Sequence, residues 1–571
     1  CNTGNNIIGM ECVAGNYWSS YTGGDRTGDG LGDTLVPHKG EGILAASPIG
    51  DNYPLVMKCG LPGLVCGNTS CPSSQSTSTG EGLAVICNNA VLDCQNYIFN
   101  GTGTNQDDER GIELINVHDV TVKNCNLTNF KYGVYIQNSY NITLFNNTIY
   151  DNTLTGIHVG SLSYGITIEN NTIKNNSNDN QSYGIHFLSS DANNNGGSTI
   201  RYNTITGQKE FGIYLSDTSD YNNITSNNIS LNTMSGIFVN GSDTNIIENN
   251  NLFNNTEHGL YFLNADGAAS LVQSNTIYNN KFSGIYLSST DNYLMYYNTV
   301  YNNSLHGVSL LSSDNHDIKN NTIYENTDTG IMVNKSSNLS LSTENIVYKN
   351  ANGIYLVSSN SSSWTQPLNL YNNSIGLYLS SSFYNYIGST PENYAGYVDS
   401  LKIYNNTLGI YVLNSNNNTL RSLNIHNNSL GISINGSINN TIYNNNFSNV
   451  LNAADNNTNF WNISSTNVTN IVNGNYTGGN FWDNYTGTDS DGDGLGDTAY
   501  TFGNVQDNHP LVTANLSCGI IKGSISLTGN LTTTTNCLTV NQNNLVIDCN
   551  NYYITGPGSG TGININGSKR E

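Results

Sequence analysis

Alternate carboxylates in one glycine-rich loop form the clearest candidate site for an ion. The loop reads Asp-Ser-Asp-Gly-Asp-Gly-Leu-Gly-Asp over residues 489–497. Alternating carboxylates on such a loop converge on a hard cation, and calcium prefers oxygen ligands of this kind. A solvated acidic turn is the alternative, but clustered carboxylates repel one another unless a cation neutralises them. We expect calcium ligands from Asp489, Asp491, Asp493 and Asp497, with the Leu495 carbonyl as a further oxygen.

A weaker copy of this loop lies near the start of the chain. It supplies Asp25, Asp29 and Asp33, but Thr27 replaces one carboxylate and Arg26 adds a positive charge. We expect the earlier loop to bind calcium less tightly or to be filled differently.

The residues that could perform acid–base chemistry are otherwise dispersed. His158 and His186 occupy equivalent positions in successive repeats, where they could bind a metal or act as a base. Ordinary members of an outward aromatic column would show the same spacing. Arg110 and Glu113 have no evident partner carboxylate one repeat away, whereas carbohydrate cleavage needs paired carboxylates. We therefore expect no enzyme, with a polysaccharide lyase or hydrolase as the alternative.

A four-residue phrase repeated fourteen times must position these side chains. It consists of Gly, a branched aliphatic residue, any residue and an apolar residue, at spacings mostly of 22 to 25 residues. A second refrain, Asn-Asn-Thr-Ile-Tyr, lies between the phrases. Such self-similarity marks a solenoid, and the short alternating segments bounded by turn residues indicate strands. The phrases begin at Gly111, Gly133, Gly156, Gly184, Gly212, Gly236, Gly259, Gly284, Gly307, Gly330, Gly353, Gly376, Gly409 and Gly431.

About 23 residues per repeat suits three short strands and three turns. We expect an all-β, right-handed parallel β-helix of about 17 coils, in which each strand pairs with its counterpart about 4.8 Å away. Equivalent side chains then stack in columns, and asparagines at one turn form amide ladders.

With these repeats, the chain resembles the parallel β-helix repeats of NosD-like and pectate-lyase-like surface proteins of archaeal type. The resemblance runs from about Leu83 to Val512. It implies the fold more than the function, because lyases, epimerases, adhesins and structural proteins share this fold. The resemblance to NosD-like proteins implies copper binding, but the sequence has no cluster of Met, His or Cys that could ligate copper. The Asp-rich loop is similar to dockerin and thrombospondin calcium loops, without the Glu of an EF-hand.

Two stretches of the sequence are duplicated at offsets of 455 to 464 residues. Residues 15–21, 30–34 and 51–56 match 479–485, 494–498 and 507–512, and residues 91–101 match 546–556. We therefore expect residues 1–58 to end one module, residues 59–517 to form a complete β-helix, and residues 518–571 to begin the next.

The eleven cysteines lie near these module boundaries and favour disulfides in an oxidising location. Free thiols or metal ligands are the alternatives, and sequence alone does not fix the connectivity. Cys549 is left without a partner. The pairs we expect are Cys1–Cys12, Cys59–Cys87, Cys66–Cys71, Cys94–Cys125 and Cys518–Cys537.

About thirty Asn-x-Ser/Thr sequons occur, many of them generated by the asparagine-rich turns themselves. Turns on an extracellular solenoid are suitable places for N-linked glycans, and we expect several to be occupied. The representative sequons are Asn126, Asn141, Asn228, Asn302, Asn405, Asn475 and Asn530.

Tyrosines fill the third place of the glycine phrase and form an outward column. High β propensity alone would favour tyrosine there, but long exposed aromatic stripes usually contact a partner. We expect lateral packing, with glycan binding as the competing interpretation. The interface residues would be Tyr135, Tyr214, Tyr261, Tyr286, Tyr355, Tyr378 and Tyr411. A second column would contain Tyr150, Tyr278, Tyr301, Tyr324, Tyr348, Tyr404 and Tyr443.

Composition narrows the class further. The net charge is −23 with 10% charged residues, which argues against nucleic-acid binding, and no apolar run is long enough to span a membrane. We expect an extracellular structural subunit or tandem module of a cell-surface filament, sheath or S-layer that assembles head to tail. A glycan-binding adhesin is the first alternative.

Overall fold

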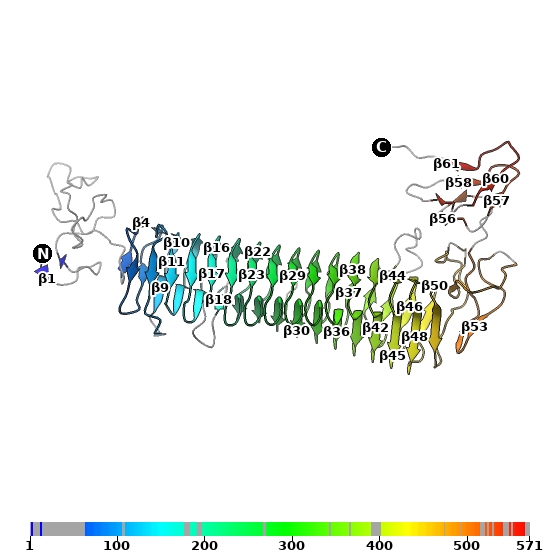
Figure 1. The fold of residues 1–571 in the computed structure, drawn as a ribbon, viewed down its shortest axis with the longest axis horizontal. Coiled ribbons are helices and arrows are strands. Elements are labelled where there is room, and N and C mark those ends of the chain that lie inside the picture. Colours follow the sequence, from blue (N-terminus) through cyan, green and yellow to red (C-terminus); the bar gives the residue numbers. More distant parts are fainter. Residues whose placement is uncertain are drawn as a thin grey trace. The chain divides into compact units, whose positions relative to one another are not determined.

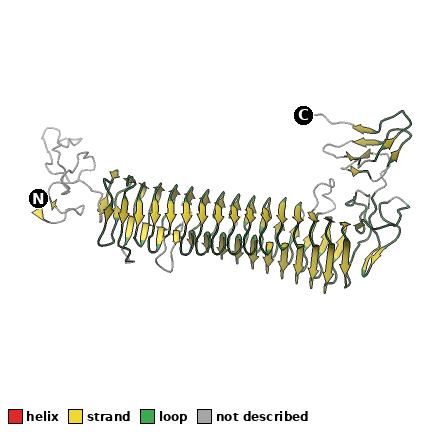
Figure 2. Cartoon of the chain, viewed as in Figure 1, coloured by secondary structure: helices red, strands yellow, loops and turns green. Residues whose placement is uncertain are grey.

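The chain is an all-β, right-handed parallel β-helix of about 19 turns, each of about 23 residues and three strands, as predicted. In the computed structural model it divides into two compact units, residues 1–282 and 283–571. Figure 2 shows strands joined by loops, and no helix occurs among the described residues. The structure describes residues 2–3, 12–13, 63–104, 109–175, 183–190, 197–265, 270–341, 344–364, 367–389, 401–472, 474, 476–490, 493–513, 520–521, 525–527, 530–540, 547–549 and 552–565.

In the first unit, successive coils stack so that each strand pairs in parallel with the equivalent strand of the next coil (Figure 1). Sheet 1a contains β3 (Gly63–Val65), β6 (Leu83–Val85), β9 (Arg110–Ile115), β12 (Tyr132–Gln137), β15 (Thr155–Val159), β18 (Tyr183–Leu188), β21 (Ile213–Ser216), β24 (Ile237–Asn240) and β27 (Leu260–Leu263). Sheet 2a contains β4 (Thr69–Ser70), β7 (Val91–Asp93), β10 (His118–Lys123), β13 (Tyr140–Phe145), β16 (Thr167–Glu169), β19 (Thr199–Arg201), β22 (Asn223–Thr225), β25 (Ile246–Glu248) and β28 (Leu271–Gln273). Sheet 3a contains β5 (Gln75–Ser76), β8 (Ile98–Asn100), β11 (Asn126–Thr128), β14 (Thr148–Tyr150), β17 (Thr172–Lys174), β20 (Thr204–Thr206), β23 (Asn228–Ser230), β26 (Asn251–Phe253) and β29 (Thr276–Tyr278).

The second unit repeats this arrangement. Sheet 1b contains β30 (Ile285–Ser288), β33 (Val308–Leu311), β36 (Thr329–Asn334), β39 (Asn352–Val357), β42 (Ile375–Ser380), β45 (Leu408–Leu413), β48 (Leu430–Asn435) and β51 (Leu451–Asp455). Sheet 2b contains β31 (Leu294–Tyr296), β34 (Asp317–Lys319), β37 (Ser340–Leu341), β40 (Ser363–Trp364), β43 (Tyr386–Ile387), β46 (Thr419–Arg421) and β49 (Thr441–Tyr443). Sheet 3b contains β32 (Thr299–Tyr301), β35 (Thr322–Tyr324), β38 (Asn345–Tyr348), β41 (Leu368–Tyr371), β44 (Leu401–Tyr404), β47 (Leu423–His426), β50 (Asn446–Ser448) and β52 (Phe481–Trp482). The other strands are β1 (Asn2–Thr3), β2 (Cys12–Val13), β53 (Tyr500–Phe502), β54 (Val505–Asp507), β55 (Ile520–Ile521), β56 (Ile525–Ser526), β57 (Leu531–Thr532), β58 (Leu538–Val540), β59 (Ile547–Asp548), β60 (Ile554–Thr555) and β61 (Ile563–Ile565).

The glycine of the repeated phrase is required by close packing between coils. A Cβ added at Gly133 would lie 2.5 Å from Cγ2 of Ile149 and 2.6 Å from the carbonyl oxygen of Gly156. The aliphatic residue that follows each glycine points inward and is buried, as Val134 and Ile157 illustrate. The phrase therefore places a residue without a side chain at the crowded start of the strand, and directly after it a side chain that fills the core.

The two asparagines of the second refrain have different structural roles. In the pair Asn146–Asn147, Asn146 is exposed and adopts a φ of 54°, the left-handed conformation that asparagine tolerates. Asn147 is buried, and its amide donates to the Val122 carbonyl and to Oδ1 of Asn171 in the next coil. Its own Oδ1 accepts the backbone N–H of Cys125. The predicted amide ladder is therefore present, and it satisfies backbone groups as well as side chains.

Residues after β51 cover the apolar end of the coils in the second unit. The Trp482 ring stacks on Phe447 of β50 at 4.7 Å and packs against Trp461. Asp507 is fully buried beneath this cover, where it accepts the indole N–H of Trp482 at 3.0 Å. It also accepts the backbone N–H groups of Asn480 and His509. Burial raises the Asp507 pKa to about 6, although these donors favour the charged carboxylate.

A second start of coiling follows this cover. Strands β55, β58 and β61 pair in parallel, as do β56 with β59 and β57 with β60. The order of pairing matches that of β3 to β9, and Leu527, Leu531 and Leu538 form a small apolar core. These turns account for the difference between the predicted 17 coils and the 19 observed.

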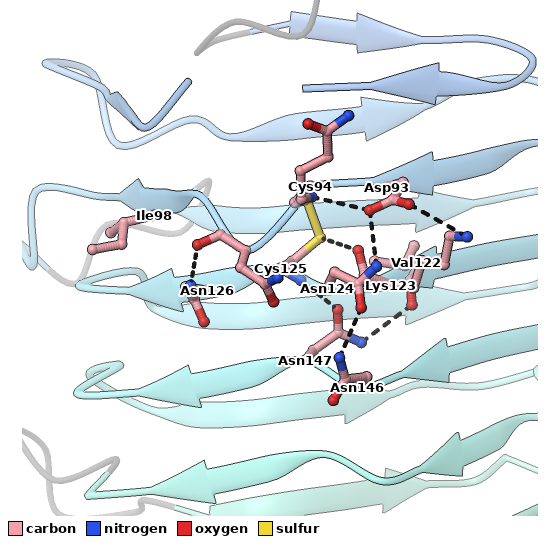
Figure 3. The surroundings of a disulfide bond; sticks show 12 residues. Asp93, Cys94, Ile98, Val122, Lys123, Asn124, Cys125, Asn126, Asn146 and Asn147 are labelled. Carbon is pink, nitrogen blue, oxygen red and sulfur yellow. Dashed lines mark hydrogen bonds and ion pairs between the residues drawn. A yellow bond between two sulfur atoms is a disulfide. The ribbon is translucent and has the colours of Figure 1, made fainter. Parts of the chain in front are cut away.

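Disulfides cross-link the first coils. The predicted pair Cys94–Cys125 is present, with Cα atoms 4.7 Å apart, beside the ladder residue Asn147 (Figure 3). The predicted pairs Cys59–Cys87 and Cys66–Cys71 are wrong, because Cys66 bonds to Cys87 across neighbouring coils with Cα atoms 4.9 Å apart. Stacking of the coils brings Cys66 and Cys87 within the range that a disulfide requires.

The remaining cysteines are described only in part. Cys71 and Cys537 are also disulfide-bonded, and Cys549 is a free thiol among the described residues. Cys1, Cys59 and Cys518 lie outside the described residues, and nothing is described of the Cys12 side chain.

Candidate functional site

Sheet 1a presents a continuous row of rings on its outward face. Strand register aligns Tyr135, His158, His186, Tyr214, Phe238 and Tyr261 in successive coils. Neighbouring rings lie 4.6 to 5.2 Å apart, and most pairs are stacked. The predicted column of the first unit is therefore correct in register, and the two histidines are members of it, as the alternative interpretation of their spacing had it.

Stacking changes what this column offers to a partner. Tyr135, Tyr214 and Tyr261 are half-buried rather than exposed, because each ring covers the face of the next. The column therefore presents ring edges and hydroxyl groups outward. The stack is interrupted between His158 and His186, whose rings lie at 65° to each other.

Charged groups lie at one end of this column. Arg110 pairs with Glu113 on the same strand, and its guanidinium lies 4.0 Å from the centre of the Tyr135 ring. Both charged side chains are partly exposed. Arg110 and Glu113, which the sequence leaves without evident partners, thus form an ion pair above an aromatic ring, where the guanidinium is attracted to the ring face.

The two histidines are neutral at physiological pH. Burial lowers the pKa of His158 to about 4 and that of His186 to about 3, and nearby positive charge acts in the same direction. The His158 Nδ1 has no hydrogen-bond partner among the described residues, whereas His186 Nε2 lies 3.1 Å from the Ser216 hydroxyl. A neutral imidazole has both a hydrogen-bond donor and an acceptor, but His158 is buried, so His186 is the more accessible of the two on this face.

Residues just before the glycine phrase add a second row beside the rings. Tyr183 lies 4.9 Å from the His186 ring and 5.2 Å from the Tyr214 ring. Burial, with the negative charge of Glu210, raises the pKa of the Tyr183 hydroxyl, which donates to Glu210. Burial also raises the pKa of Glu210 itself, and the charge on Glu257 raises it further.

Glu257 is the second carboxylate of this row. Burial raises its pKa, and the Ser235 hydroxyl donates to its Oε2 at 3.5 Å. Backbone hydrogen bonds link Glu210 to Met234 and Met234 to Glu257, so the two glutamates lie two coils apart. At one strand spacing per coil, their backbones are about 10 Å apart. Sequence reasoning missed both glutamates, although each stands two residues before a repeat glycine.

The predicted tyrosine column of the second unit has gaps. Register aligns Tyr286, Ser309, Met332, Tyr355, Tyr378 and Tyr411 on sheet 1b. Tyr355, Tyr378 and Tyr411 stack at 4.3 and 4.9 Å, and all four tyrosines are half-buried. This column lacks the histidines and the flanking tyrosine–glutamate pair of sheet 1a.

A longer aromatic stack runs along sheet 3b. Neighbouring rings are 4.9 to 5.1 Å apart and within 12° of parallel. The prediction that Tyr443 belongs to this column is wrong. Tyr443 lies on β49 of sheet 2b, where its hydroxyl accepts a hydrogen bond from Arg421. The stack consists of Tyr301, Tyr324, Tyr348, Tyr371, Tyr404 and His426.

Carboxylates of the Asp-rich loop accept hydrogen bonds from the backbone of the same loop. Asp489 accepts the N–H of Gly494, Asp493 that of Leu495, and Asp497 that of Ser490. The bonds from Ser490 lower the pKa of Asp497. Asp491, Asp25, Asp29 and Asp33 lie outside the described residues. Among the described residues no three His, Cys, Asp or Glu side chains gather as a metal site.

Among the predicted glycosylation sites, Asn141, Asn228, Asn302, Asn405 and Asn530 are exposed and Asn126 is half-buried. Asn475 lies outside the described residues. Within the described part of the chain, no helix is long and apolar enough to cross a bilayer.

Comparison with known proteins establishes the family. The family model described as "Right handed beta helix region" matches residues 73–229, 110–282 and 221–375, which together are more than half of the chain. The chain therefore belongs to the right-handed β-helix family. The model of the periplasmic copper-binding protein NosD matches residues 388–487. No curated protein is similar enough in sequence to match the chain.

Several solved structures are similar to this chain at low identity. The periplasmic alginate epimerase AlgG is 15% identical with a TM-score of 0.37, over 62% of this chain and 80% of that one. The A-module of the Azotobacter vinelandii mannuronan C-5 epimerase AlgE6 is 14% identical with a TM-score of 0.34, over 70% and 89%. The catalytic domain of a GH87 α-1,3-glucanase is 12% identical with a TM-score of 0.26, over 54% and 59%.

These comparisons correct the expectation that the protein is not an enzyme. The similar solved structures include epimerases and a glucanase.

Proposed function

We propose that this protein is an extracellular or periplasmic β-helix that binds a polysaccharide along the outward face of sheet 1a. The observation that carries the proposal is the row of rings from Tyr135 to Tyr261, bordered by Arg110–Glu113 and by Tyr183–Glu210. Sugar binding needs apolar ring surfaces together with several directed polar groups. Among the described residues, sheet 1b has the rings with His306 and Asp328 beside them, but neither an arginine–glutamate nor a tyrosine–glutamate pair, so we assign the binding face to the first unit.

The charge of the protein favours a neutral polysaccharide. A net charge of −23 repels polyanions over distances comparable to the Debye length, and the ion pair with Glu113 neutralises Arg110. Neutral polysaccharides experience no such repulsion, and their hydroxyl groups can form hydrogen bonds with tyrosine, imidazole and carboxylate groups.

Glu210 and Glu257 supply groups for cleavage of the bound chain. Inverting glycosidases hold two carboxyl groups about 6.5 to 9.5 Å apart, which suits side chains whose backbones are two coils apart. Glu210, with Glu257 charged nearby, would protonate the leaving glycosidic oxygen. Glu257 would take a proton from the water that attacks the anomeric carbon, so that one C–O bond breaks as another forms.

The Tyr183→Phe variant tests the proposed face. It keeps the ring but removes the hydroxyl that pairs with Glu210, and we expect affinity for a neutral polysaccharide to fall about tenfold. Affinity electrophoresis on a panel of neutral and acidic polysaccharides measures the change. Tyr378→Phe, which removes a hydroxyl from sheet 1b, is the matched control and should bind as the wild type does.

An assay of sugar release from the polysaccharide tests the proposed cleavage. Glu210→Gln and Glu257→Gln should retain binding and lose release at least a hundredfold, whereas Glu248→Gln on sheet 2a should retain both. Equal loss in all three variants would contradict the roles assigned to Glu210 and Glu257. Equal binding by Tyr183→Phe and wild type would contradict the proposed face.

A second candidate function is structural, as a tandem module that self-associates into a filament, sheath or S-layer. It is favoured by the second start of coiling over β55 to β61, which repeats β3 to β9. Calcium at 489–497 would stiffen the joint between modules, and Tyr355, Tyr378 and Tyr411 would contribute to lateral contacts. The residues of the loop fit a hard cation, since all its donors are oxygens.

Electron microscopy tests this candidate. Removal of residues 518–571 should leave short particles where the full chain gives fibres, and a calcium chelator should shorten the fibres. Fibres of unchanged length from the truncated chain would contradict head-to-tail association. The triple variant Tyr355→Ser, Tyr378→Ser, Tyr411→Ser should separate laterally packed fibres without unfolding the protein.

A further inference from the structure

One column of turns in the second unit carries sequons beside the aromatic stack of sheet 3b. The residues directly after the stacked rings are Asn302, Glu325, Lys349, Asn372, Asn405 and Asn427, and all six have φ between 54° and 57°. Four of the six begin an Asn-x-Ser/Thr sequon, and the other two form an ion pair of 2.8 Å. We call the four asparagines the sequon row.

The side chains of the sequon row are accessible for modification. Asn302, Asn372, Asn405 and Asn427 are exposed, and within the described part of the chain none of their amides has a hydrogen-bond partner. The hydroxyl residues that complete these sequons are exposed as well, namely Ser304, Ser374, Thr407 and Ser429.

Other sequons hold their amide in a hydrogen bond. Asn141 donates through Nδ2 to Asp119, and Asn146 donates through Nδ2 to Asn124 of the preceding coil. Both are exposed and have the same left-handed backbone as the sequon row. Exposure and backbone conformation therefore do not distinguish the two groups of asparagines. They differ in whether Nδ2 donates a hydrogen bond.

We propose that N-linked glycans are attached to the sequon row of the folded coil, and that Asn141 and Asn146 remain unmodified. Nδ2 of an accessible asparagine forms a bond to the anomeric carbon of a sugar carried on a lipid phosphate. The bond from that carbon to the phosphate oxygen breaks, and the amide proton leaves with the released lipid phosphate. An amide that already donates to a neighbouring coil must first break that bond.

Glycans in this row would lie along the edge of sheet 3b. They would cover the stack from Tyr301 to Tyr404 with hydrophilic groups and keep that face from packing against a neighbour. The inference concerns a different sheet from the polysaccharide face, so it does not depend on the proposed function.

Glycopeptide mass spectrometry of the protein isolated from cells that glycosylate it tests the inference. Peptides containing Asn302 and at least one of Asn372, Asn405 and Asn427 should be modified, and those containing Asn141 and Asn146 should be bare. Modification of Asn141 or Asn146 to the same extent as Asn302, or bare asparagine throughout the row, would overturn it.

The variant Asn124→Gly gives a second, independent test. Glycine suits the φ of 55° at this position, and its introduction removes the acceptor of the Asn146 amide. Occupancy at Asn146 should rise about tenfold, the factor that one lost hydrogen bond contributes. Unchanged occupancy at Asn146, in a variant that keeps the wild-type melting temperature, would show that the amide bond does not select the site.

Discussion

Asp507→Ala should lower the stability of the second unit by about 3 to 5 kcal/mol. Its carboxylate accepts hydrogen bonds from the Trp482 indole, the Asn480 backbone and the His509 backbone, and it is fully buried. Alanine leaves three donors without partners, two of them buried, and each unsatisfied buried group costs about 1 to 3 kcal/mol. Thermal unfolding followed by calorimetry measures the loss.

Asp507→Asn serves as the isosteric comparison. The amide oxygen of the asparagine can still accept hydrogen bonds from the donors that face one carboxylate oxygen. The NH2 group takes the place of the other oxygen, faces its donors and cannot accept from them. We expect an intermediate loss of stability and a shift in Trp482 fluorescence in both variants. A melting temperature within one degree of wild type for Asp507→Ala would contradict the role assigned to this carboxylate.

Asn147→Ala should cost about 2 to 4 kcal/mol, the second large effect. Asn147 accepts the backbone N–H of Cys125 and donates to the Val122 carbonyl, and both groups lose their partner inside the coil. Asn146→Gly is the matched control, because its side chain is exposed and glycine accepts the same left-handed backbone. Urea or thermal unfolding of the two variants compares a buried with an exposed member of one Asn-Asn pair.

The control should remain within about 0.5 kcal/mol of wild type. Equal destabilisation by Asn147→Ala and Asn146→Gly would show that the turn conformation, and not the buried amide ladder, limits stability. Because each coil contacts mainly its neighbours, we expect the loss to be local to the first unit.

The sequence predicts the coil because period and side-chain direction are coupled in a strand. The phrase that begins at Gly133 indicates, without any structural information, that Val134 and Ile136 face the core. The amide ladder follows from the same periodicity, but the separate roles of Asn146 and Asn147 depend on backbone conformation. A refrain of two identical residues gives no sign of which one is buried.

The candidate site was harder to predict for a different reason. Glu210 and Glu257 are separated by 47 residues, and although their shared position before a repeat glycine puts them in one row, the sequence does not show that their side chains are partly buried beside Tyr183 and Ser235. The same uncertainty in coil length explains the misplacement of Tyr443, whose refrain belongs to sheet 2b rather than sheet 3b. Likewise, Cys66 and Cys87 become neighbours through stacking, which the spacing of the cysteines does not show.

Hydroxyl-radical footprinting of the tyrosines, with and without a bound neutral polysaccharide, tests the central claim most directly. We expect oxidation of Tyr135, Tyr183 and Tyr214 on sheet 1a to fall on binding, while oxidation of Tyr355 and Tyr378 on sheet 1b stays unchanged. Protection of the sheet 1b tyrosines with no change on sheet 1a would contradict the assignment of the binding face, as would unchanged oxidation of all five at saturating polysaccharide.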